Sequence, residues 1–162
     1  MCETIKVGMA DLNVCKEPDQ LITLGLGSCV GIVLYDTSTK ISGMVHVMLP
    51  DSTKIKNNEN KAKFADTGIQ ELLNNMLELG AMRSKIVAKI AGGAHMFTFG
   101  ACTGEFMQVG ERNVAAAKEI LNSLKIDILA EDTGLNYGRT IVFDSVSGML
   151  KIKAIGQEDK YI

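Results

Sequence analysis

The chain has 162 residues, and its 17 basic and 19 acidic side chains leave a net charge of −2. It therefore lacks the basic excess typical of nucleic-acid-binding proteins, and its 5% of aromatic residues offer little surface for base stacking. Hydrophobic residues make up 46% of the sequence, which predicts one globular domain over residues 1–162. Its apolar runs are too short to span a membrane and its first residues lack an apolar signal segment, so we expect a cytoplasmic protein without membrane insertion.

Short apolar and β-branched runs dominate the first third of the chain. They predict strands at residues 5–9, 12–15, 21–24, 30–35 and 41–49. The polar segment 36–40 joins the last two strands, which we therefore interpret as a β-hairpin. Pro50 and Asp51 end this hairpin, and the polar residues 51–63 predict an exposed loop.

Two helices and four more strands are predicted in the rest of the chain. A helix over 64–79 follows from apolar residues spaced i, i+3, i+4 and i+7, with Gly80 as its stop. A second helix is predicted over 113–124, after an irregular glycine-rich segment at 97–110. The remaining elements are strands at 85–90, 126–130, 140–143 and 149–155, with a polar loop at 131–139. Because strands mostly follow strands, the eight or nine strands and two helices predict an α+β fold with mixed β-sheet.

A glycine turn ends at a cysteine in the middle of this pattern. Gly25-Leu-Gly-Ser28 separates two predicted strands and places Cys29 where the second strand begins. Glycines allow backbone amides to approach a ligand closely, so a thiol here resembles a nucleophile beside an oxyanion site. The competing interpretation is that Cys29 is a small buried hydrophobic residue.

The second strand of the hairpin carries a histidine that can act as the base for this thiol. Folding the chain about residues 37–39 brings Cys29 near His46. Side chains alternate along a strand, so the two share a face only if paired residue numbers sum to an odd value. We expect His46 to lower the pKa of the Cys29 thiol and to make it the most reactive of the four cysteines. A satisfied core histidine is the alternative.

Thr23, six residues before the cysteine, is a candidate for the residue that orients His46 through a hydrogen bond, although threonine is also ordinary in strands. Cys2, Cys15 and Cys102 have no base near them in sequence and are interpreted as structural. The spacing of the cysteines and of the two histidines disfavours a zinc site. Gly25-x-Gly27 is a weak match to a dinucleotide fingerprint because position 30 is valine and no helix follows.

The motifs Thr23-Leu-Gly-Leu-Gly-Ser-Cys29 and Met44-Val-His-Val-Met-Leu-Pro50 resemble those of the CheD family of chemoreceptor glutamine deamidases. Further similar segments are Ala65-Asp-Thr67, Lys89-Ile-Ala-Gly-Gly-Ala94, Gly110-Glu-Arg-Asn-Val114 and Ala130-Glu-Asp-Thr-Gly134. The resemblance covers nearly the whole chain. It implies a mixed-sheet or β-sandwich core flanked by helices, similar to the cysteine hydrolase domains of deamidating toxins, and a catalytic triad of Cys29, His46 and Thr23.

The resemblance also implies an activity, a substrate and a partner. The substrate is the cytoplasmic domain of methyl-accepting chemoreceptors, whose glutamine side chains become glutamates without any cofactor. Many members also bind CheC, a phosphatase that restrains the deamidase. Three alternatives remain open from the sequence: a glutamyl methyl esterase, another cysteine acyl hydrolase such as a protease or transglutaminase, and a non-catalytic adaptor that binds the receptor or CheC.

Overall fold

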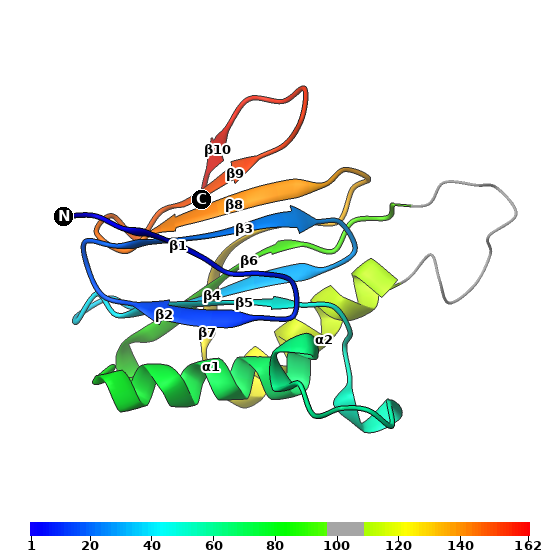
Figure 1. Ribbon diagram of the computed structural model, residues 1–162, viewed down its shortest axis with the longest axis horizontal. Helices are drawn as coiled ribbons and strands as arrows, with labels where there is room; N and C mark the ends of the chain where they lie inside the picture. Colours follow the sequence, from blue (N-terminus) through cyan, green and yellow to red (C-terminus); the bar gives the residue numbers. More distant parts are fainter. Residues whose placement is uncertain (97–108) are drawn as a thin grey trace, which may run out of the picture.

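The computed structural model describes residues 1–96 and 109–162. It has an α+β fold in which two five-stranded mixed sheets stack face to face and two helices cover the outer face of one sheet (Figure 1). This arrangement confirms the α+β class that the succession of elements predicts. No helix within the described residues is both long and apolar enough to cross a membrane.

The sheet farther from the helices, here called sheet A, has the strand order β1-β3-β8-β9-β10. β1 pairs with β3 in parallel, and the other neighbours are antiparallel. The strands of sheet A are β1 (Thr4–Lys6), β3 (Gln20–Leu26), β8 (Arg139–Asp144), β9 (Leu150–Lys153) and β10 (Lys160–Tyr161).

The sheet next to the helices, sheet B, has the order β2-β5-β4-β6-β7. Only β6 and β7 pair in parallel. Its strands are β2 (Leu12–Cys15), β4 (Val30–Asp36), β5 (Ser42–Val47), β6 (Ile86–Gly92) and β7 (Asp127–Thr133). The chain therefore passes from sheet A to sheet B between β3 and β4, where the glycine turn lies.

The two long helices are α1 (Ala65–Leu79) and α2 (Val109–Ser123). α1 ends where sequence spacing predicted, because Gly80 adopts the left-handed backbone with φ +111° and closes the last turn. Short 3₁₀ turns occur at η1 (Ser52–Lys54), η2 (Lys61–Lys63) and η3 (Arg83–Lys85).

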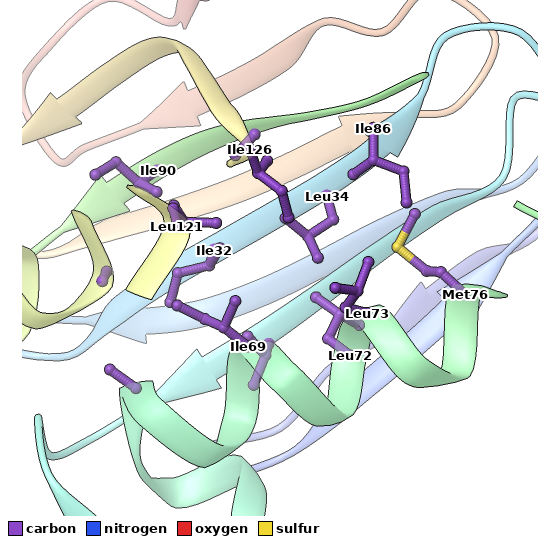
Figure 2. Close-up of a cluster of buried hydrophobic side chains, with 14 of the residues drawn as sticks. Ile32, Leu34, Ile69, Leu72, Leu73, Met76, Ile86, Ile90, Leu121 and Ile126 are labelled. Carbon is purple, nitrogen blue, oxygen red and sulfur yellow. The ribbon is translucent and has the colours of Figure 1, made fainter. Parts of the chain in front are cut away.

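The core has two layers because the central strand β4 is buried on both faces. Val30, Ile32 and Leu34 point toward the helices, whereas Val33 and Tyr35 lie between the two sheets. Figure 2 shows the helix-side layer, in which aliphatic side chains of sheet B interdigitate with those of the helices: Ile32, Leu34, Ile69, Leu72, Leu73, Met76, Ile86, Ile90, Leu121 and Ile126.

Several predicted boundaries differ from the structure. α2 begins four residues before the predicted residue 113, because the apolar spacing does not extend into its first turn. β7 continues into the predicted loop at 131–139, where its acidic residues pair with basic partners. β10 was not predicted, and the loop at 51–63 contains η1 and η2. Most of the predicted irregular segment 97–110 and Cys102 lie outside the described residues.

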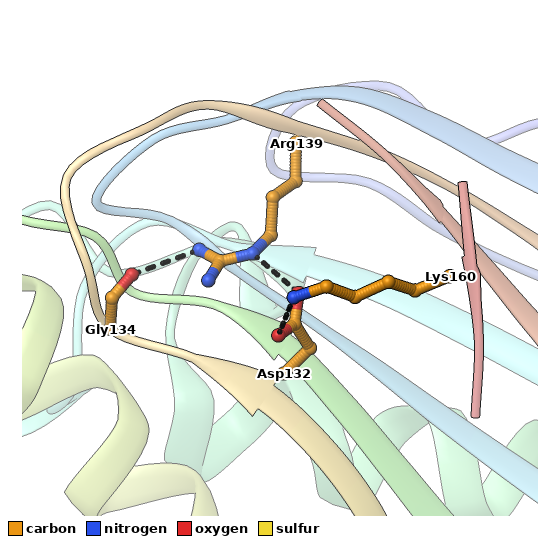
Figure 3. A network of polar contacts seen from close by, with 4 residues as sticks. All are labelled: Asp132, Gly134, Arg139 and Lys160. Atoms are coloured by element: carbon orange, nitrogen blue, oxygen red, sulfur yellow. Dashed lines mark hydrogen bonds and ion pairs between the residues drawn. The ribbon is translucent and has the colours of Figure 1, made fainter. Parts of the chain in front are cut away.

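A buried ion pair joins the two sheets near the glycine turn (Figure 3). Arg139, whose side chain is fully buried, extends from β8 in sheet A to Asp132 in β7 of sheet B, with 3.0 Å between Nε and Oδ2. It also donates to the carbonyl oxygen of Gly134 at 3.0 Å. Lys160 approaches the other oxygen of Asp132 at 3.3 Å. Because Arg139 pairs with Leu26 in sheet A, this network also supports the end of β3.

We expect Asp132→Ala to destabilise the protein strongly, because it leaves the Arg139 guanidinium buried without its carboxylate. Removing one partner of a buried pair costs about 3–5 kcal/mol. For a chain of this length that corresponds to a fall in Tm of roughly 6–20 °C. Lys160→Ala is the matched control, since that lysine is half-exposed and its loss should change Tm little. Equal melting temperatures for Asp132→Ala and the unmutated protein would contradict a stabilising role.

Candidate active site

The register of the β4–β5 hairpin places the predicted nucleophile and base on one face of sheet B. Val30 pairs with Val47 and Gly31 with His46, so paired numbers sum to an odd value, as the shared face requires. Cys29 lies two residues before Gly31 and is therefore a diagonal neighbour of His46. Such diagonal positions are roughly 7–8 Å apart at Cα, within reach of two side chains that extend toward each other.

Gly31, directly opposite His46, allows the two sheets to approach closely. A Cβ at this position would stand 2.7 Å from Cδ1 of Ile141 and 3.2 Å from Cδ1 of Leu26, both in sheet A. A larger residue at this position would therefore force the Ile141 and Leu26 side chains of sheet A to move. Thr23 pairs with Ile141 in sheet A, so this close approach also brings Thr23 toward His46.

The hydrogen bond predicted between Thr23 and His46 is present and crosses from sheet A to sheet B. Thr23 Oγ1 lies 2.8 Å from His46 Nδ1 and 2.7 Å from the carbonyl oxygen of Val7. The threonine hydroxyl has one hydrogen, and a carbonyl oxygen can only accept, so that hydrogen is donated to Val7. The hydroxyl must then accept from Nδ1–H. This arrangement fixes the neutral imidazole in the tautomer whose Nε2 carries a lone pair.

The other ring nitrogen of His46 is buried and unpaired in the part of the chain that the structure describes. His46 is fully buried, and its Nε2 has no hydrogen-bond partner among the described residues. Burial disfavours the charged imidazolium and lowers the pKa of His46 below its ordinary value of 6.5. The imidazole is therefore neutral at pH 7, with an unoccupied lone pair on the face that it shares with Cys29.

Cys29 is 8% exposed and packs within the layer between the sheets. Burial raises the pKa of its thiol above the ordinary value of 9.0. The sequence-based expectation that His46 lowers this pKa is therefore wrong for the resting protein. The thiolate loses solvation in the core, and a neutral imidazole offers no positive charge to compensate. The resting pair is a neutral thiol and a neutral imidazole.

Hydrogen bonds hold the turn before Cys29 against the end of β6. Gly93 N donates to the carbonyl oxygen of Cys29 and Ala94 N to that of Gly27, both at 2.8 Å. Gly92 permits this contact, because its φ is +111° and a side chain there would overlap the Cys29 carbonyl. The amide of Gly27 donates to the carbonyl oxygen of Gly25 at 3.1 Å. The amides of Ser28 and Cys29 follow directly in the same turn.

The remaining cysteines and the second histidine lie elsewhere. Cys15 is buried at the end of β2, where burial and then Asp19 raise its pKa to about 11, and Cys2 is exposed. His95 contacts Glu111 at 2.9 Å at the protein surface. Among the described residues, Thr23 is the one whose side chain hydrogen-bonds to His46, and neither these residues nor Cys29 forms such a bond in the structure.

Asn113 was not identified from the sequence as a site residue. Its side chain is fully buried and donates to the carbonyl oxygens of Ser28 and Met48, each at 2.9 Å. The segment Gly110-Glu-Arg-Asn-Val114 contributes to the family resemblance, but the sequence assigns no role to its asparagine. An asparagine in a helix has many ordinary roles. No property of the sequence by itself indicates that it reaches the nucleophile turn.

We expect Thr23→Ala to disturb His46. The substitution removes the acceptor for Nδ1–H of His46, a net hydrogen-bond contribution of about 0.5–1.5 kcal/mol, which corresponds to roughly a threefold to tenfold loss in the rate of a reaction that uses Nε2 as a base. A larger loss is expected to the extent that the tautomer of His46 is no longer selected. Thr23→Ser keeps the hydroxyl and should retain most of the activity. Single-turnover rates of both variants, with thermal melts to verify folding, measure this effect. A well-folded Thr23→Ala variant with undiminished rate would reduce Thr23 to an ordinary strand residue.

Comparison with known proteins gives a family match and curated relatives. The family model described as CheD chemotactic sensory transduction matches residues 48–154. A probable chemoreceptor glutamine deamidase CheD from Lachnoclostridium phytofermentans is 68% identical over 162 residues, which cover 100% of both chains. The one from Caldanaerobacter subterraneus is 56% identical, over 98% of this chain and 97% of the relative. The chemoreceptor glutamine deamidase CheD of Halalkalibacterium halodurans is 50% identical over the full length of both.

Proposed function

The chain belongs to the CheD family, and from that premise we propose that it is a chemoreceptor glutamine deamidase, a hydrolase of bacterial or archaeal chemotaxis. In this proposal Cys29 is the nucleophile, His46 is the general base and acid, and Thr23 orients His46. The single observation that carries the residue assignment is the pair of hydrogen bonds made by Thr23, because they leave Nε2 of His46 unprotonated on the face of Cys29. A buried histidine kept only for packing is expected to have both ring nitrogens paired, whereas Nε2 of His46 has no partner among the described residues.

The first half of the proposed reaction forms a thioester. His46 Nε2 accepts the thiol proton as Cys29 Sγ attacks the side-chain carbonyl carbon of a receptor glutamine. The proton moves within a neutral pair, so no free thiolate accumulates in the buried site. Amides of the turn that ends at Cys29, those of Ser28 and Cys29, stabilise the oxyanion of the tetrahedral intermediate. The intermediate then expels ammonia, which receives its proton from Nε2 of His46.

The second half hydrolyses the thioester. Water enters as ammonia leaves, and His46 Nε2, which has lost its proton to ammonia, removes one from the water. The hydroxide adds to the thioester carbonyl, and the second tetrahedral intermediate expels the Cys29 sulfur, which recovers a proton from His46. The products are a glutamate side chain and ammonia, and the thiol and imidazole regain their starting states. The chemistry proceeds without a cofactor.

The same residues can hydrolyse a glutamyl methyl ester, with methanol as the leaving group, so the esterase remains a second candidate activity. We propose the cytoplasm as the location of the enzyme, because the proposed substrate side chains belong to the cytoplasmic domain of chemoreceptors. CheC, the partner that the family resemblance implies, is proposed on that resemblance alone.

Mass spectrometry of a purified receptor cytoplasmic domain tests the proposal. Incubation with the enzyme should add about one dalton per converted glutamine, because an amide NH₂ becomes an acid OH, and should release ammonia in equal amount. A non-catalytic adaptor would bind the fragment without any mass change. A protease would shorten the fragment, and a transglutaminase would release ammonia only with an amine acceptor. Any of these three outcomes would overturn the deamidase assignment.

The pH dependence follows from the two pKa shifts. Since burial lowers the pKa of His46 below 6.5, its basic form persists as pH falls through 6.5 and is lost only below that value. Since burial raises the pKa of Cys29 above 9.0, the neutral pair persists through pH 8. We expect kcat/KM for receptor deamidation to be nearly constant from about pH 7 to 8 and to fall at pH values below about 6.5.

Alkylation of Cys29 by iodoacetamide provides an independent check of this pH prediction. A resting thiolate–imidazolium pair would give rapid alkylation with little dependence on pH between about 5 and 8. The neutral pair instead predicts alkylation that accelerates with pH over this interval. Peptide mapping is needed, because Cys2 is exposed and will also be modified.

A further inference from the structure

We propose that Asn113 is a positioning residue for the reaction, which fixes the spacing between the strand that carries the nucleophile and the strand that carries the base. This inference rests on the proposed function. Asn113 lies on α2, behind sheet B, and its side chain is fully buried. It contacts the backbone on either side of the site rather than the reacting atoms.

The two strands separate at the point where Asn113 contacts them. The β4–β5 ladder ends at the pair Val30 and Val47. In a continued ladder Leu49 N would donate to the carbonyl oxygen of Ser28. Instead Leu49 N donates to the carbonyl oxygen of Lys63 at 3.1 Å, and the Ser28 oxygen accepts from Asn113. The hairpin therefore forks just where Cys29 and His46 must act together. Without a further contact, nothing in the ladder would fix the width of this fork.

Asn113 provides that contact. Its Nδ2 donates at 2.9 Å to the carbonyl oxygen of Ser28, which precedes the nucleophile, and at 2.9 Å to that of Met48, two residues after the base. Both bonds start from one nitrogen, so the two oxygens lie no more than 5.8 Å apart, twice the bond length. Carbonyl oxygens only accept, and the amide orientation is therefore determined by its partners.

The carbonyl end of the Asn113 side chain shows that its two donors, rather than its acceptor, are used in this structure. Oδ1 of Asn113 is buried without a hydrogen-bond partner among the residues that the structure describes. A buried acceptor left unpaired is costly, so this side chain is not optimal for stability alone. What it supplies is two donors in a fixed geometry, one for each arm of the fork. Displacing reacting groups by about 1 Å can cost on the order of 10²-fold in rate.

The test compares Asn113→Ala with a control that disturbs the same helix elsewhere. Leu121→Ala removes a fully buried side chain of α2 that contacts neither Ser28 nor Met48, and should lower Tm without changing kcat. Asn113→Ala should lower kcat for receptor deamidation on the order of 10²-fold with little change in KM, because the fork aligns the reacting groups and does not bind the receptor. Alkylation of Cys29 at pH 7.5 should slow as well.

Asn113→Ser keeps one donor and should recover part of the lost kcat, and it replaces the alanine variant if that variant does not fold. A folded Asn113→Ala protein with the kcat of the unmutated enzyme would overturn the proposal. So would a loss of kcat equal to that of Leu121→Ala at the same fall in Tm. These results would leave the deamidase assignment intact, because that assignment is tested separately by the mass gain of the receptor fragment.

Discussion

Cys29→Ala is expected to abolish deamidation of the receptor fragment while leaving the fold intact. The substitution removes the only atom that forms the thioester, and no other described thiol lies near His46. Cys29→Ser should be almost as inactive, because a serine hydroxyl is far less acidic than a thiol and His46 is a weak base in this buried site. The measurement is the mass gain of the receptor fragment under single-turnover conditions.

Cys15→Ala is the matched control for this experiment. Cys15 is also buried, but it lies at the end of β2, and its thiol contacts the backbone of Asp19. The control should therefore retain full activity. A Cys29→Ala variant that still converts glutamine would exclude the thioester route and leave water as the nucleophile. Binding of the receptor fragment by the inactive variant would show that the docking surface is undisturbed.

His46→Ala is expected to lower the single-turnover rate by about 10²–10⁴-fold, the usual contribution of a general acid–base residue. Both the activation of the thiol and the protonation of departing ammonia depend on Nε2. The residual activity should rise with pH, because the Cys29 thiol must then ionise without help. This pH dependence distinguishes loss of the base from loss of the fold.

His95→Ala is the control for the second histidine. His95 contacts Glu111 at the surface and is half-exposed, so its removal should leave the rate unchanged. A thermal melt of His46→Ala is also required, since that side chain is buried and its loss creates a cavity. If His46→Ala retained the rate of the unmutated enzyme, Cys29 would need a different base, and the interpretation of Thr23 would fail with it.

Local patterns in the sequence predicted much of the fold. The strand over residues 12–15 agrees with β2, and β4 and β5 form the predicted hairpin. The register of this hairpin was left open by the sequence and is known from the structure alone. The end of α1 at Gly80 was also predicted. These features depend on short-range signals such as alternation, turn residues and a helix stop. The division into two sheets could not be predicted, because it depends on pairing between distant segments such as β3 with β8.

The site was predicted in part for the same reason. Cys29 and His46 belong to one hairpin, so proximity in sequence indicated proximity in space. The pKa of Cys29 was predicted in the wrong direction, because its burial depends on the stacking of sheet A, which no local pattern reveals. Asn113 is more than 60 residues from both of the segments that it joins, as the separations of 85 and 65 residues show.

The Thr23–His46 bond between the two sheets also limits how the site can be transferred to another protein. Residues 29–47 contain a hairpin that an engineer could graft onto a different β-scaffold together with the proposed nucleophile and base, provided that the spacing fixed by Asn113 is also reproduced. The graft would lack the acceptor for Nδ1–H, which comes from sheet A, and nothing would select the tautomer with a free Nε2. A working transplant needs the hairpin, including the glycine opposite the histidine, and a second sheet that places a hydroxyl within hydrogen-bond distance of Nδ1.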